Sequence, residues 1–201
     1  MKIYLASASP RRRDLLEQLH IKFEVVTSTY EEHNEEFESP YELVEAQALE
    51  KALGALVPET GCHQDYVVIG SDTIVSHKGH VLGKPANEKE AAQMLRELSD
   101  DTHEVVTGVA LCYYDGDKQL IKQEVFHVVT KVLFYSLSDA EINAYVATGE
   151  PLDKAGAYGI QGQGAYLVER IEGSYTNVVG LPVEVVARYL RRMGGRTNSV
   201  N

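Results

Sequence analysis

The sequence is short of positive charge, of cysteine and of long apolar runs, and it contains no tryptophan. Its 201 residues include 19 Lys and Arg against 30 Asp and Glu, which gives a formal net charge of −11. Proteins that bind nucleic acid or anionic membranes over a broad surface normally carry a basic excess, so the composition argues against both partners. No apolar run approaches the roughly 20 residues that a membrane-spanning helix needs.

The two cysteines, Cys62 and Cys112, lie in different contexts and show no repeated spacing. This pattern predicts neither a disulfide framework nor a zinc site. The first residues form a short apolar stretch followed by charge, which lacks the apolar centre of a secretion signal. We therefore expect a soluble, reduced protein of the cytoplasm.

The length allows one large domain or two small ones, and we expect a single α/β domain over residues 1–195, followed by a disordered tail at 196–201. A hydrophobic content of 44% is enough for a sizeable core, and no internal repeat or long linker divides the chain. Short β-branched stretches alternate with capped helical stretches. The expected strands cover residues 3–6, 23–26, 66–75, 105–114, 125–134 and 166–171, and the expected helices begin near residues 10, 40, 88, 139 and 183.

Positive charge is concentrated directly after the first expected strand. Ser9 suits a helix N-cap and Pro10 the first helical position, and three arginines follow at residues 11–13. The N-terminus of a helix is the positive end of its dipole, so arginines are unexpected there. Either they hold a small anion together with the helix start, or they form a solvated face that pairs with Asp14 and Glu17.

A second unusual feature is an acidic residue inside an apolar strand. In "VVIGSDTIV", residues 67–75, apolar side chains fill both faces, which is typical of a strand covered on both sides. Asp72 lies in its middle, and Gly70 leaves room beside it. A buried carboxylate needs a partner. Asp72 is therefore either a member of an ordinary ion pair, a cap for nearby backbone amides, or a catalytic or metal-binding group.

Two lysines and two histidines are placed less clearly. Lys84 follows the expected hairpin partner of the Asp72 strand, so these two residues can be close in space, and Lys51 lies on a small-residue helix face that favours inward packing. Each is equally compatible with a solvated surface charge. His77 and His80 flank a turn glycine, and we expect them to be solvated turn residues rather than a metal pair.

A glycine-rich segment, "GEPLDKAGAYGIQGQGAY", covers residues 149–166 and contains Gln161. Glycines allow the backbone to approach a ligand closely or to adopt positive φ. The segment matches neither the phosphate-binding GxxxxGK[ST] pattern nor the dinucleotide-binding GxGxxG pattern. It is either a plain loop or a ligand cradle.

Eight blocks in order resemble the Maf family of nucleotide pyrophosphatases. They run from residue 5 to about residue 183 and read "LASASPRR", "YEE", "EKA", "GSDTIV", "GKP", "AAQMLRELS", "GEPLDKAGAYGIQG" and "VVGLPV". The resemblance implies an α/β fold related to the inosine triphosphatase group, with a central mixed sheet, flanking helices and two lobes around a cleft. It also implies hydrolysis of a nucleoside triphosphate to the monophosphate and pyrophosphate, a divalent cation such as Mg²⁺ or Mn²⁺, and a homodimer.

The resemblance also implies roles for the residues around the helix start and for the two lysines. Ser7 and Arg12 match positions that bind phosphate, and a helix N-terminus with arginines suits a triphosphate. Lys51 and Lys84 match positions that offset charge at the reacting centre. A triphosphate is then the small anion that the arginines hold.

Further matches concern the residues that hold the metal and those that select the nucleobase of the substrate. Glu32 and Asp72 match metal-holding and water-activating positions, with Asp72 as the proposed proton acceptor. Arg11, Thr73 and Gln161 match the branch that prefers dTTP and UTP, whereas the branch that prefers 7-methyl-GTP carries Trp, Gln and Glu there. The alternative is a regulator of cell division that binds nucleotide without hydrolysing it, because the family is also associated with inhibition of septum formation.

Overall fold

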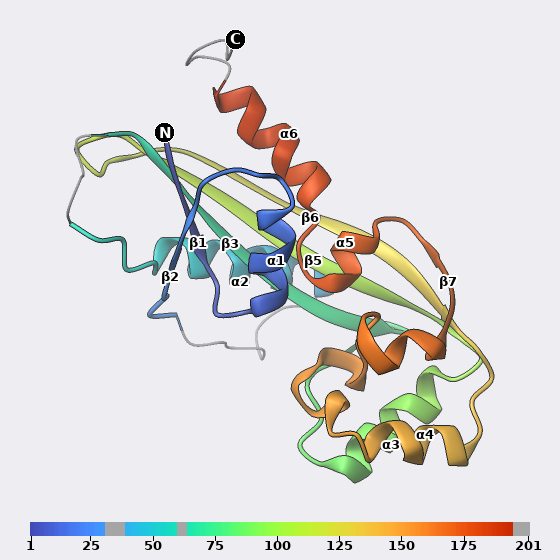
Figure 1. Ribbon diagram of the computed structural model, residues 1–201. Coiled ribbons are helices and arrows are strands. Elements are labelled where there is room, and N and C mark those ends of the chain that lie inside the picture. Colours follow the sequence, from blue (N-terminus) through green and yellow to red (C-terminus); the bar gives the residue numbers. More distant parts are fainter. Residues whose placement is uncertain (31–38, 60–63, 195–201) are drawn as a thin grey trace.

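The computed structural model describes residues 1–30, 39–59 and 64–194 (Figure 1). The predicted disordered tail at 196–201 lies outside these residues, and the single-domain prediction stays a prediction. Strands and helices alternate through most of the described chain. In order they are β1 (Lys2–Ala6), α1 (Pro10–Glu17), β2 (Glu24–Val26), α2 (Pro40–Leu53), β3 (Tyr66–His77), β4 (His80–Leu82), α3 (Glu88–Leu98), β5 (Thr102–Tyr114), β6 (Leu120–Phe134), α4 (Asp139–Val146), the 3₁₀ helices η1 (Glu150–Asp153), η2 (Ala155–Ala157) and η3 (Gly162–Leu167), β7 (Val168–Glu172), α5 (Tyr175–Val179) and α6 (Val183–Gly194).

The strands of the described chain form one seven-stranded mixed sheet. Its order is β2-β1-β3-β5-β6-β7, and β4 pairs with β3 outside this path. β1 runs parallel to β2 and β3, whereas the other neighbours are antiparallel. The prediction of an α/β fold with a central mixed sheet and flanking helices is confirmed.

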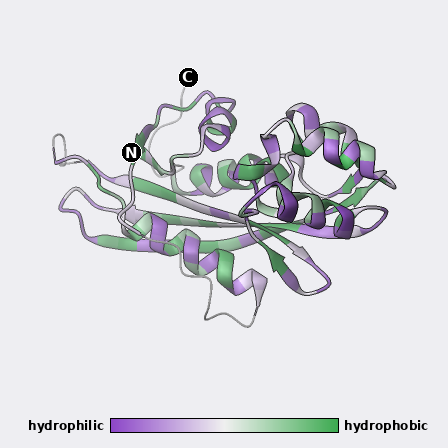
Figure 2. Ribbon diagram, turned by 90° about the horizontal axis from the view of Figure 1, so that it is seen from below, coloured by the Kyte–Doolittle hydropathy of each residue, from purple (hydrophilic) through white to green (hydrophobic). Residues whose placement is uncertain are grey.

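Helices cover both faces of this sheet (Figure 2). Among the described helices, α2 alone packs on one face, against Val68 and Val106. On the other face, α1 and α6 pack around Leu16 and Ile69, while α3, α4 and the 3₁₀ helices form a separate group around Leu95. Figure 1 shows α3 and α4 apart from α1, α5 and α6. The two groups are the two lobes that were predicted.

Two strand glycines bring α2 directly onto the sheet. A Cβ atom at Gly70 would lie 2.1 Å from the carbonyl oxygen of Ala48, and one at Gly108 would lie 2.1 Å from that of Val44. A side chain at either position would therefore collide with the helix backbone. This close approach places the last turn of α2, which carries Lys51, over β3.

The prediction for His77 is wrong, while His80 is exposed as expected. His77 is 1% exposed, and its ring nitrogens lie 2.9 Å from the Glu97 carboxylate and 3.0 Å from the Asp101 carboxylate. The alternation of β3 explains this placement, because His77 shares the face of Val75, which packs in the α3 group. The predicted hairpin between β3 and β4 is confirmed.

Most predicted elements are present, and the main omissions lie after α4. The glycine-rich segment forms three short 3₁₀ helices, and the strand expected at 166–171 begins two residues later, at Val168. The short helix α5 was not predicted. No helix in the described ranges is long and apolar enough to cross a membrane.

Candidate active site

One edge of β3 lacks a strand neighbour over residues 71–74. β1 pairs with this edge as far as Gly70, and β4 pairs with it from Val75 onward. Among the described residues, no strand fills the interval between them. The loop from β1 to α1 lies at one end of this gap, and the chain after β4, with Lys84, leaves from the other. The gap therefore leaves a stretch of β3 without a described strand partner on this edge, next to a helix N-terminus.

Arg12 is held over this gap by groups from three parts of the chain. The side chain of Ser9 caps α1 and accepts a hydrogen bond from the backbone N–H of Arg12. The Arg12 guanidinium donates to the Gly180 carbonyl oxygen at 2.8 Å, to Thr73 Oγ1 at 3.0 Å and to Ser7 Oγ at 3.4 Å. The structure thus brings the two predicted phosphate-binding residues together, with Thr73 beside them.

A buried network behind Thr73 fixes its hydroxyl. Thr107 Oγ1 donates to the backbone oxygen of Asn177 at 3.0 Å and lies 2.9 Å from Thr73 Oγ1. Because Thr107 gives its one proton to Asn177, Thr73 accepts from Arg12 and directs its own proton to Thr107 Oγ1 or to the Gly180 carbonyl oxygen at 3.4 Å. Asn177 Nδ2 donates to the Val105 carbonyl oxygen and to Thr130 Oγ1, both at 3.0 Å. Sequence reasoning missed Asn177, since its partners come from two distant strands.

Asp72 points to the opposite face of β3, toward α2. Its Oδ1 lies 2.6 Å from Lys51 Nζ, and the two side chains are 9% and 15% exposed. A nearly buried carboxylate is retained in its charged form when a cation and hydrogen bonds compensate the loss of water. Of the two alternatives left open for Lys51, the structure shows the inward one, and the pair leaves a charged carboxylate next to the gap.

The donors present are compatible with part of a metal site. The described residues contain no group of three or more His, Cys, Asp or Glu side chains placed to hold a metal ion. Mg²⁺ needs only one or two carboxylates when substrate phosphates and water complete its ligands. Asp72 fits the role of one such carboxylate. Glu32, the other predicted ligand, lies outside the described residues.

The three arginines at the start of α1 have three different surroundings. Arg13 lies 3.4 Å from Asp14 and 3.7 Å from Glu17, so the solvated-face interpretation holds for this residue. Arg11 instead pairs with Asp153 of η1, at 3.7 Å, and so links the two helix groups. Only the middle arginine turns inward over the gap.

The chain matches the model of the family described as Maf-like protein over residues 2–193. It is a member of the Maf-like family. A relative from Bacillus thuringiensis subsp. konkukian (strain 97-27), named dTTP/UTP pyrophosphatase, is 48% identical over 191 residues, 95% of each chain. A second relative, from Bacillus cereus (strain AH820) and with the same name, is 47% identical over 191 residues, again 95% of each chain. A solved structure of a nucleoside-triphosphatase / dITP/XTP pyrophosphatase from Mycobacterium abscessus matches 99% of this chain and 100% of its own chain, at 18% sequence identity and a TM-score of 0.40.

Two predicted site residues of this Maf-like protein stand apart from the others. Lys84 and Gln161 are both exposed, and neither side chain forms a hydrogen bond or ion pair with another residue of the described chain. The backbone N–H of Gly156 donates to the Gly83 carbonyl oxygen at 3.1 Å, so the glycine-rich segment docks next to Lys84. Their predicted roles stay predictions.

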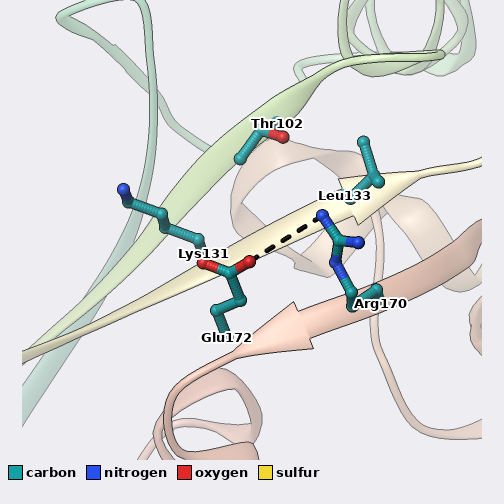
Figure 3. A pocket seen from close by; sticks show the side chains of 5 residues that line it. All are labelled: Thr102, Lys131, Leu133, Arg170 and Glu172. Carbon is teal, nitrogen blue, oxygen red and sulfur yellow. Dashed lines mark ion pairs between the residues drawn. The ribbon is translucent and has the colours of Figure 1, made fainter.

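Two hollows of the Maf-like protein lie elsewhere on the sheet. One of about 220 Å³ is lined by Thr102, Lys131, Leu133, Arg170 and Glu172 (Figure 3). An adjoining one of about 400 Å³ shares Thr102 and Lys131 with it. None of the predicted site residues lines either hollow, and Arg170 is partly neutralised by Glu172 at 3.8 Å. We therefore place the site at the gap in β3.

Proposed function

We propose that this chain hydrolyses dTTP and UTP to the nucleoside monophosphate and pyrophosphate. The observation that carries the proposal is the anchoring of Arg12 over the gap in β3, one residue along the strand from a buried, paired Asp72. An anion site and a protected carboxylate thus meet at a single strand. The names of the relatives at 47–48% identity support the choice of reaction and substrates.

The phosphate chain is best accommodated at the start of α1. Backbone N–H groups of a first helical turn point outward and attract anions, and here Arg12 adds a guanidinium beside them. Ser7 Oγ lies within 3.4 Å of that guanidinium and supplies a hydroxyl on the same side. Together these groups bind the phosphates and fix their position relative to β3.

Asp72 is the group placed to receive a proton from the attacking water. Its carboxylate is charged, is held by Lys51 and is largely shielded from solvent. In such a site, electrostatic interactions are stronger than in bulk water, so Lys51 can offset negative charge that develops on the phosphate oxygens. A divalent cation held by Asp72 and Glu32 would supply further neutralisation of the triphosphate. The cation, a homodimer and a cytoplasmic location remain part of this proposal.

A panel of nucleotides tests the proposed reaction. With Mg²⁺ or Mn²⁺, the purified chain is expected to release pyrophosphate from dTTP and UTP with a higher kcat/KM than from ATP, GTP or 7-methyl-GTP. A preference for purines would contradict the substrate assignment and leave the reaction type standing. Nucleotide binding without any turnover would contradict the enzyme assignment and favour the cell-division regulator.

Removing the Arg12 side chain should separate phosphate binding from nucleoside binding. Charge-assisted hydrogen bonds contribute about 1.5–3 kcal/mol, so Arg12→Ala is expected to weaken binding of an α,β-methylene triphosphate analogue by roughly 10- to 100-fold. Binding of the monophosphate should change much less. Calorimetry with both ligands measures the difference.

Arg13→Ala is the matched control for this experiment, because Arg13 is exposed and pairs only with carboxylates of its own helix among the described residues. It should leave both affinities nearly unchanged. Equal losses of both ligands in Arg12→Ala would assign Arg12 a structural role in holding Gly180 and Thr73.

A further inference from the structure

We propose that Tyr145 and Glu150 are positioning residues for base selectivity, because they hold the glycine-rich segment that presents Gln161. The inference rests on the proposed function and extends it to residues outside the gap in β3. Tyr145 belongs to α4 and Glu150 begins η1, so both lie in the lobe opposite α1.

The two side chains bind the segment on both sides of Gln161. Glu150 Oε1 accepts hydrogen bonds from the Tyr145 hydroxyl at 2.9 Å and from the backbone N–H of Gly164 at 3.1 Å. Glu150 Oε2 accepts from the backbone N–H of Gln163 at 3.2 Å. The Tyr145 hydroxyl in turn accepts from the backbone N–H of Gly159 at 3.2 Å. Three main-chain donors are thus fixed by one connected pair of side chains.

The glycines of the segment match this pair closely. A Cβ atom at Gly164 would lie 2.2 Å from the Gly159 carbonyl oxygen and 2.7 Å from the Tyr145 hydroxyl. Gly162 has a φ of +68°, a conformation that residues with a side chain rarely adopt. A Cβ atom there would lie 3.1 Å from Glu150 Oε2. The path of the backbone is therefore determined by contact with Tyr145 and Glu150.

The Tyr145 hydroxyl is suited to this double role. The residue is 1% exposed, and burial raises the pKa of its phenol. The hydroxyl consequently keeps its proton and can donate to Glu150 while accepting from Gly159. A phenylalanine would keep the ring in the core and lose both hydrogen bonds.

Gln161 is the side chain that this arrangement leaves available. It is exposed, and its amide forms no hydrogen bond within the described chain, whereas the backbone is fixed at the second residue before it and at the second and third residues after it. An amide on a fixed backbone can match the O2, N3–H and O4 groups of uracil or thymine. A base with a different pattern leaves polar groups unpaired, and this lowers kcat/KM strongly. Selectivity then depends on the Tyr145–Glu150 pair as well as on Gln161.

The test compares Tyr145→Phe with Tyr166→Phe. Tyr166 is 46% exposed, its hydroxyl donates to the Glu141 carbonyl oxygen at 3.2 Å, and its ring contacts that of Tyr145 edge-on. Tyr145→Phe is expected to lower the ratio of kcat/KM for dTTP to kcat/KM for GTP by about 10-fold, which corresponds to about 1.4 kcal/mol of discrimination between the two nucleotides. The Tyr166→Phe control should keep the wild-type ratio.

A double-mutant cycle shows whether Tyr145 acts through Gln161. In a Gln161→Ala background, Tyr145→Phe should cause no further loss of the ratio. A further loss of equal size in that background would overturn the inference, since Tyr145 would then act independently of Gln161. If Tyr145→Phe does not fold, Glu150→Gln replaces it in the same cycle, because an amide nitrogen cannot accept the hydrogen bonds that the second carboxylate oxygen accepts.

The outcomes separate this inference from the proposed function. A wild-type chain that releases pyrophosphate, together with a folded Tyr145→Phe variant of unchanged ratio, contradicts this inference alone. A wild-type chain without pyrophosphate release contradicts the proposed function, and the inference falls with it. Hydrogen exchange gives a direct structural readout: the amides of Gly159 and Gly164 should exchange faster in Tyr145→Phe and at the wild-type rate in Tyr166→Phe.

Discussion

Turnover of dTTP is expected to fall by at least about 100-fold when Asp72 is replaced by asparagine, the scale typical of losing a general base. Asparagine keeps the size of the side chain but can neither accept a proton from water nor bind a cation strongly. It also leaves Lys51 without the carboxylate that lies 2.6 Å from its ammonium group. Initial rates of pyrophosphate release measure the loss.

Asp65→Asn is the control for this substitution, because Asp65 is exposed and directly precedes the same strand. It should keep the wild-type rate. Thermal unfolding of both variants separates loss of chemistry from loss of structure, since breaking a buried ion pair is itself destabilising. A folded Asp72→Asn variant with a rate close to wild type would remove Asp72 from the reaction.

Base preference is expected to narrow or reverse when Arg11→Trp, Thr73→Gln and Gln161→Glu are combined. The 7-methylguanine base is cationic, so an aromatic face and a carboxylate should favour it. Uracil and thymine are neutral and lose the amide partner that Gln161 offers. The measurement is the ratio of kcat/KM for dTTP to that for 7-methyl-GTP in wild type and variant.

The structure assigns different parts of this effect to Thr73 and Gln161. The Thr73 hydroxyl already contacts Arg12 and Thr107, so its first role is to hold the guanidinium. Thr73→Gln alone should therefore lower kcat/KM for both dTTP and 7-methyl-GTP. Gln161→Glu alone should change the ratio of the two kcat/KM values. A triple variant that keeps the full wild-type preference for dTTP would show that these positions do not select the base.

The parts of the site that are local in sequence could be predicted from it. Ser9 caps α1 as expected, because a cap involves only residues a few positions apart. The apolar pattern of β3 and its single acidic residue predicted a buried, partnered Asp72, and the small-residue face of α2 made an inward Lys51 one of two alternatives. Each of these signals is contained within one element.

Other parts depend on elements that meet only in the folded chain. Asn177 bonds residues of β5 and β6 that lie 72 and 47 positions away. The Tyr145 hydroxyl accepts a hydrogen bond from the backbone of Gly159, 14 residues later, and a backbone contact of this kind leaves no pattern in the sequence. His77 was misplaced for the same reason, since turn chemistry was visible in the sequence while its carboxylate partners, 20 and 24 residues away, were not.

The most direct test of the central claim is hydrolysis of dTTP in ¹⁸O-labelled water, with both products analysed by mass spectrometry. Attack of water at the α-phosphorus, next to Asp72, predicts one labelled oxygen in the thymidine monophosphate and none in the pyrophosphate. Label in pyrophosphate would place the attack at the β-phosphorus. Release of orthophosphate with thymidine diphosphate would contradict the proposed reaction altogether.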